Sequence, residues 1–196
     1  MLSKMIDKIV AYWVITNITK EEDSDIYVYG LDLIFSSIIN IAMVMITAVI
    51  MNKVPESIAL LAMIIPLQSC GGGFHAKTHL CCFLIMYIGW WIVVPLISFI
   101  TPIFGTMLAF VSLVIIFKLA PVPHVNVPMS RERFNKMKVV VRYVAVGGAV
   151  MGVGLMWLAE KAGFIGGSVI AGMGVVALSM AVARAVYWWE KKRGGG

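Results

Sequence analysis

The sequence has few charged residues, and this scarcity excludes most soluble folds. Only 13% of its 196 residues are charged and 61% are hydrophobic, whereas a soluble domain has about 25% charged and roughly 45–50% apolar residues. A chain this short has too small an interior to hide so much apolar surface from water. We therefore expect an integral membrane protein with one membrane domain, residues 1–193, followed by a glycine tail, residues 194–196.

Cysteine is also scarce, which argues against a secreted disulfide framework. The three cysteines, Cys70, Cys81 and Cys82, fall within thirteen residues, and adjacent cysteines are poorly placed to bridge each other. At least one free thiol is expected. A cleavable signal peptide is not predicted, because residues 1–12 contain charges and have neither a long uncharged run nor a small-residue cleavage site.

Long apolar runs are what the sequence has in abundance. In chain order they cover residues 26–51, 56–68, 80–100, 103–119, 139–158 and 165–188. Because a helix needs about 20 apolar residues to cross a bilayer, we expect an all-α bundle of about six transmembrane helices. The second run is short, so a four-span version in which it forms a re-entrant segment remains open.

Basic residues predict the orientation of these spans. With six spans, one side of the membrane receives the basic positions 77, 131–138 and 191–193, whereas the loops on the other side have Lys53 and Lys161. Cytoplasmic loops carry an excess of Lys and Arg. We therefore expect a multi-pass protein of the cell membrane with both termini in the cytoplasm.

The first 20 residues precede the apolar runs and have their own pattern. Apolar residues recur at helical spacing from Leu2 to Trp13 and lie on one face. This predicts an amphipathic helix at the membrane surface, with an ordinary helix packed on the bundle as the alternative.

The last two runs are rich in glycine. The pairs Gly148/Gly152 and Gly167/Gly172 lie at or near the spacing that lets helices approach closely in lipid. We expect these glycines to serve packing rather than chemistry.

One segment combines a nucleophile with candidate bases. Cys82 follows His75 by seven residues and His79 by three, and a histidine can take the proton of a thiol. Helical spacing slightly favours His79, whereas His75 needs a bend, which the glycines at 71–73 allow. Two further readings are a metal pair of His75 and His79, and a purely structural role for these residues.

Asp32 is the one acid placed inside an apolar run. An acid there is costly unless it is partnered, so it would orient a histidine, pair with a base such as Arg142, or reach the membrane interface. A second function also follows from it: a small transporter or peptide exporter with Asp32, His75 and His79 as ion-handling groups. The fourth and sixth runs have almost no polar residues near the middle of the membrane, which disfavours a transport path.

Several of these residues together resemble a known family. The sequence GGFHAKT at residues 72–78, with Cys82 seven residues after the histidine, is similar to the signature of the AgrB family, the accessory gene regulator B proteins of Gram-positive bacteria. YGLD at residues 29–32 and the proline-rich loop at 120–128 resemble family features in the same order. Gln68 stands near a position where the family would have an arginine.

The resemblance implies a membrane cysteine endopeptidase that processes the precursor of a cyclic autoinducing peptide in quorum sensing. Cys82 would be the nucleophile and His75 the base, and an internal Cys or Ser of the peptide would attack the resulting thioester to close a ring. Candidate supporting residues are Asp32, Gln68, Gly72 and Gly73, and candidate contacts to an acidic part of the precursor are Lys77, Arg131, Arg133 and Lys136. We expect a homodimer in the lipid bilayer, without a cofactor, a metal ion or a nucleic-acid partner.

Overall fold

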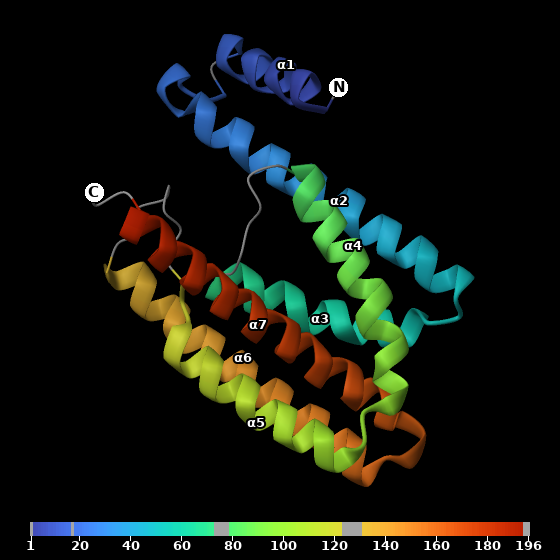
Figure 1. Cartoon of the computed structure of the whole chain (residues 1–196). Coiled ribbons are helices and arrows are strands. Elements are labelled where there is room, and N and C mark those ends of the chain that lie inside the picture. Colours follow the sequence, from blue (N-terminus) through green and yellow to red (C-terminus); the bar gives the residue numbers. More distant parts are fainter. Residues whose placement is uncertain (1, 17, 73–78, 123–130, 194–196) are drawn as a thin grey trace.

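The computed structural model describes residues 2–16, 18–72, 79–122 and 131–193, and all regular structure in these ranges is helical (Figure 1). The helices are α1 (Leu2–Ile15), α2 (Ser24–Ile50), α3 (Val54–Gly71), α4 (His79–Leu96), α5 (Pro102–Leu119), α6 (Arg131–Leu158) and α7 (Gly163–Arg193), with short 3-10 turns η1 (Glu21–Asp23), η2 (Ile97–Phe99) and η3 (Glu160–Ala162). The predicted all-α fold is confirmed.

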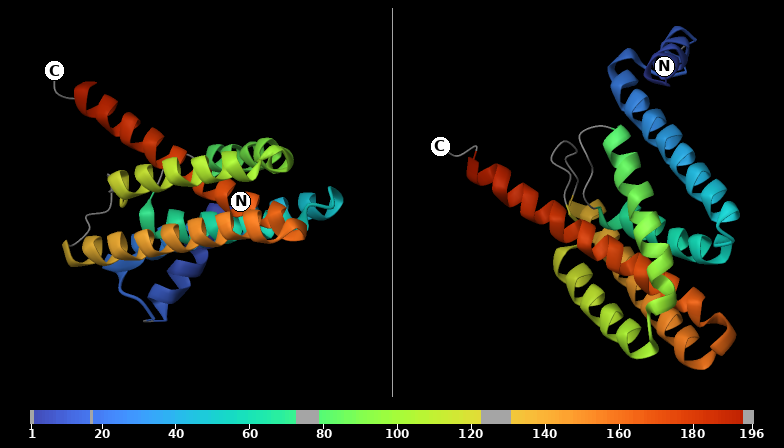
Figure 2. Two further views of the ribbon diagram at one scale, coloured as in Figure 1. Left: turned by 90° about the horizontal axis from the view of Figure 1, so that it is seen from below. Right: turned by 45° about the vertical axis from the view of Figure 1, so that its right-hand side comes forward.

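Helices α3, α5, α6 and α7 form the main bundle, in which α7 packs against the other three (Figures 1 and 2). The buried residues of α7 that contribute most to this core are Val169, Ile170, Met173, Val176 and Met180. Because α7 has a neighbour on several sides, it needs small residues wherever a partner backbone comes close.

The glycines of α6 and α7 provide this close approach. A Cβ atom added to Gly152 would lie 2.8 Å from the Ile170 side chain, and one added to Gly172 would lie 3.0 Å from the carbonyl oxygen of Leu60. The predicted packing role is therefore confirmed. These glycines face helices of the same chain, so they lend no support to the predicted homodimer, which stays a prediction.

Four helical segments among the described residues are long and apolar enough to cross a membrane: Val54–Gly71, Pro102–Leu119, Phe134–Leu158 and Gly163–Trp189. There are two shorter apolar segments: Ile34–Ile50 in α2, and Phe83–Phe99, which covers most of α4 and the turn η2. The six-span count is thus supported for four helices and stays a prediction for α2 and α4.

Two helices differ from the predicted runs at their ends. α3 has 18 residues and is continuous through Pro66, which extends the short second run to span length and speaks against a re-entrant turn there. α6 begins at Arg131, eight residues before the predicted run. Its first turns are charged but helix-forming, and Glu132 pairs with Lys136 one turn later at 2.8 Å. A search for apolar runs alone does not detect these charged first turns of the helix.

Helices α1, α2 and α4 form a second unit, here called the arm, which meets the bundle at α3 and near the start of α7 (Figure 2). α1 packs on α2 through the buried Ile6 and Val10, and the Trp13 ring meets Tyr27 edge-on at 6.1 Å. The N-terminal helix therefore exists and packs on another helix of the chain. Its location at a membrane surface stays a prediction.

Candidate active site

Two segments singled out from the sequence leave the bundle side by side. The Val122 N–H, just after α5, donates a hydrogen bond of 2.9 Å to the carbonyl oxygen of Gly71 at the end of α3. Gly71 is also where α3 meets α6 and α7, because an added Cβ would collide with the Met180 side chain and would lie 3.5 Å from Val141. The glycine–histidine segment and the proline-rich loop thus start from one junction at one end of the bundle.

Gly72 fixes the direction in which the chain leaves this junction. Its φ of 70° and ψ of −176° fall in a region that essentially only glycine adopts. Its N–H donates a 3.0 Å hydrogen bond to the Gln68 carbonyl, and an added Cβ would lie 2.7 Å from the carbonyl oxygen of Val122. Conformation and space therefore both require glycine here.

The candidate nucleophile, Cys82, follows Gly72 by ten residues along the chain. Helix α4 begins at His79, so Cys82 lies in its first turn. The segment 73–78, which contains Gly73, His75 and Lys77, lies outside the described residues. The described part of the motif therefore begins on the bundle and ends on the arm.

The side chains of several other residues singled out from the sequence also lie outside the part of the chain whose side chains the structure describes. These are the side chains of Asp32, His79, Cys81, Cys82 and Arg133. The pairing of Cys82 with a histidine, the role of Asp32 and the metal pair of His75 and His79 accordingly stay predictions. Gln68 lies in the last turn of α3 with a half-buried side chain, next to the junction.

The remaining basic candidates lie on the exposed start of α6. Arg131 is exposed, and Lys136 forms the exposed ion pair with Glu132. Such surface pairs contribute little to stability, so Lys136 can exchange this partner for another carboxylate at small cost.

The sequence pointed to the loop that contains Val122 but not to the contact of this residue with Gly71. This contact joins positions about fifty residues apart, and no local pattern links them. The available signal was topological, because the six-span prediction puts both loops on the same side of the membrane.

Comparison with known proteins gives one match. No curated protein and no solved structure matches the chain. The family model of Accessory gene regulator B (AgrB) matches residues 2–181, a range that begins in α1 and ends in α7 and includes both loops of the junction. The chain therefore belongs to the AgrB family, which is associated with the processing of autoinducing peptides.

Proposed function

We propose that this membrane protein is a cysteine endopeptidase that cleaves the precursor of a quorum-sensing autoinducing peptide on the cytoplasmic side of the cell membrane. One observation carries the proposal: in a chain of the AgrB family, the Gly-Gly-Phe-His segment begins at a fixed glycine and leads to Cys82 in the first turn of a helix. Membership points to peptide processing, and the cysteine–histidine pair supplies a chemistry for it.

In the proposed reaction, His75 takes the thiol proton of Cys82, and the thiolate attacks the carbonyl carbon of the scissile peptide bond. The C–N bond then breaks, and the leaving amine takes the proton from the imidazolium of His75. The remaining peptide stays on Cys82 as a thioester. An internal Cys or Ser of the peptide attacks this thioester while its proton passes through His75 to the departing Cys82 sulfur, which restores the thiol and closes a thiolactone or lactone.

Three features of the fold support this chemistry. The first turn of a helix carries partial positive charge, which stabilises a thiolate, and Cys82 lies in the first turn of α4. The backbone conformation of Gly72, three residues before His75, fixes the direction in which the chain leaves α3. A site next to apolar helices also limits water, which favours ring closure over hydrolysis of the thioester.

The precursor would be held through its acidic part. Arg131 and Lys136 are exposed at the start of α6, and α6 starts at the end of the bundle where α3 ends (Figure 1). A cluster of cations there raises the local concentration of an acidic peptide. With a positive-inside orientation, both termini lie in the cytoplasm. As a separate part of the proposal, which follows from the family resemblance, the protein acts as a homodimer in the bilayer.

A transporter receives less support from the described residues. A transport path needs polar side chains that face one another across the bundle. In the described parts of the bundle, the buried polar residues are Glu56 and Ser57 in the first turn of α3, Ser112 in α5 and Ser168 in α7. Glu56 pairs with Lys53 at 2.8 Å, and Ser57 and Ser168 donate to the Lys53 and Phe164 carbonyls, so these groups are satisfied locally. We therefore propose the peptidase alone.

The test is processing of a tagged precursor co-expressed with the wild-type protein or with single variants. We expect Cys82→Ala and His75→Ala to abolish the shorter product while the protein still accumulates in the membrane. Cys81→Ala and His79→Ala are the matched controls and should still process. Processing by Cys82→Ala at the wild-type level would refute the proposal, and loss with His79→Ala but not His75→Ala would reassign the base.

A further inference from the structure

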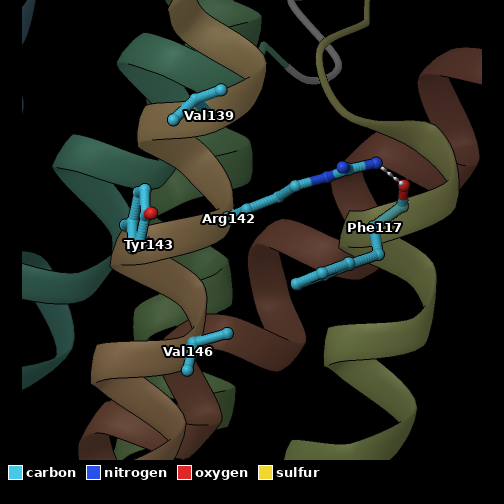
Figure 3. Close-up of a pocket in the computed structure, with 5 residues that line it drawn as sticks. All are labelled: Phe117, Val139, Arg142, Tyr143 and Val146. Carbon is cyan, nitrogen blue, oxygen red and sulfur yellow. Dashed lines mark hydrogen bonds between the residues drawn. The ribbon is translucent and has the colours of Figure 1, made fainter.

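A shallow groove runs between α5 and α6 near the junction end of the bundle (Figure 3). Its volume is about 290 Å³, and its lining residues are Phe117, Val139, Arg142, Tyr143 and Val146. Apart from Arg142 and the Tyr143 hydroxyl, this lining is apolar. Val139, Tyr143 and Val146 are exposed, so the groove is open on the side where a membrane-spanning bundle meets lipid.

Arg142 brings a positive charge into this groove that no described residue neutralises. One Nη atom donates to the Phe117 carbonyl at 3.3 Å, and the guanidinium carbon lies 5.0 Å from the centre of the Phe117 ring. Nε is buried without a hydrogen-bond partner. Arginine has five N–H donors, and the single bond shown in Figure 3 goes to a neutral acceptor.

The depth of Arg142 makes this unpaired charge significant. It lies in the span Phe134–Leu158, eight residues or about 12 Å from Phe134 and about 24 Å from Leu158 along the helix. The hydrocarbon core is about 30 Å thick, so Arg142 lies inside the span but near its boundary. A cation at this depth is costly unless it meets an anion.

We propose that this groove binds an anionic phospholipid. Its phosphate accepts hydrogen bonds from Nη donors of Arg142 for which no described residue is an acceptor, and an acyl chain lies along Val139, Tyr143 and Val146. The Phe117 ring and carbonyl hold the guanidinium in place by a cation–π contact and a hydrogen bond. A lipid fits better than a peptide segment because the groove opens sideways and its walls are hydrocarbon-facing.

The charge around the groove adds to this preference. Lys118 follows Phe117 in the last turn of α5, and Arg131, Lys136 and Lys138 precede the groove on α6. Each basic residue near a bilayer surface favours anionic lipid by about 1 kcal/mol, which corresponds to about fivefold in affinity. The proposal does not depend on Cys82 or on peptidase activity.

The test is a lipid titration of the purified full chain in a neutral detergent, followed by native mass spectrometry. The probes are phosphatidylglycerol and phosphatidylcholine with identical acyl chains. Wild type should bind the first phosphatidylglycerol about fivefold or more tightly than phosphatidylcholine. Equal binding of the two lipids by wild type would overturn the proposal without recourse to any variant.

Variants then assign the site. Arg142→Gln should weaken phosphatidylglycerol binding about fivefold and leave phosphatidylcholine binding unchanged, and Arg142→Lys should restore part of the difference. Arg184→Gln is the matched control, because Arg184 is an exposed arginine towards the C-terminal end of α7 and outside the groove. Equal losses in Arg142→Gln and Arg184→Gln would reduce the effect to general charge attraction and overturn the site.

A competition experiment distinguishes the lipid from the other possible occupants of the groove, a simple anion and an acidic peptide. Inorganic phosphate and a short oligoglutamate peptide are added to the wild-type complex with phosphatidylglycerol. We expect neither to displace the lipid, because neither has an acyl chain for the groove. Displacement by the peptide would identify a peptide site, and displacement by phosphate would identify a simple anion site; either result overturns the lipid proposal.

Discussion

The helices of the bundle and the helices of the arm are held in place by different kinds of contact. In the bundle, α6 and α7 approach so closely that a Cβ on Gly166 would collide with the Gly152 carbonyl oxygen. The arm is instead linked by polar side chains: the Tyr87 and Thr47 hydroxyls lie 3.2 Å apart, and Trp90 Nε1 donates to Ser57 Oγ at 2.9 Å. At the closest approach of α6 and α7 the contact therefore requires the absence of a side chain, whereas these two contacts of the arm require its presence.

This difference predicts unequal tolerance of mutation. A close backbone contact cannot accept an added methyl group without movement of a whole helix. A side-chain hydrogen bond between helices is worth about 0.6 kcal/mol on average in a membrane protein, so its loss leaves the packing in place. Because the candidate motif starts on the bundle at Gly72 and reaches the arm at Cys82, movement of the two units relative to each other would alter the site.

The largest effect is expected for Gly166→Ala. The new methyl group would collide with the Gly152 carbonyl oxygen and would lie 2.8 Å from Met156 Cγ, so α6 and α7 must separate. We expect a loss of about 2 kcal/mol or more in unfolding free energy, measured by SDS titration of the purified protein. Gly154→Ala is the control, since nothing lies within 4 Å of its added Cβ. Equal stability of both variants would contradict the close contact.

Gly72→Ala tests the junction between the two units. An alanine at this φ and ψ costs about 1–3 kcal/mol, and its Cβ would lie 2.7 Å from the Val122 carbonyl oxygen. We expect the protein to accumulate but precursor processing to fall at least about tenfold, since about 1.4 kcal/mol corresponds to a factor of ten. Gly89→Ala, where an added Cβ meets nothing within 4 Å, should process normally. Normal processing by Gly72→Ala would show that the direction fixed at this residue is unimportant.

Trp90→Phe should have a moderate effect on the contact between α4 of the arm and α3 of the bundle. It removes the bond to Ser57 Oγ, while Ser57 keeps its own donation to the Lys53 carbonyl at 2.7 Å. We expect a loss of about 1 kcal/mol in unfolding free energy and little change in the bundle. The neighbouring and more exposed Trp91 provides the control variant Trp91→Phe. If Trp91→Phe were the more damaging change, the role given to the Trp90 N–H would be wrong.

The smallest effect is expected for Tyr87→Phe. Thr47 keeps a 2.9 Å bond to the Met43 carbonyl of its own helix, so the loss should be about 0.6 kcal/mol. A double-mutant cycle with Thr47→Val measures the coupling between the two hydroxyls. A coupling near zero would mean that α2 and α4 are held by apolar contacts alone.

Much of the fold could be predicted from the sequence, since apolar composition and proline or glycine at the ends are local signals. The helices at residues 26–51 and 103–119 were placed to within a few residues of α2 and α5. The start of α6 was missed because charged residues at 131–138 look like a loop when only apolar runs are sought. For the site, the sequence identified Gly72 but not its contact with Val122, because that contact joins distant parts of the chain.

The sequence alone determined that this is a helical membrane protein of the AgrB type, because lipid requires each apolar segment to satisfy its own backbone hydrogen bonds. Only the tertiary structure decided which glycines pack: Gly152 and Gly166 face each other across α6 and α7, whereas Gly147 and Gly154 face open space. It likewise decided that Arg142 meets Phe117. The physical reason is that composition acts locally, whereas the choice of neighbour depends on how helices distant in the sequence pack together.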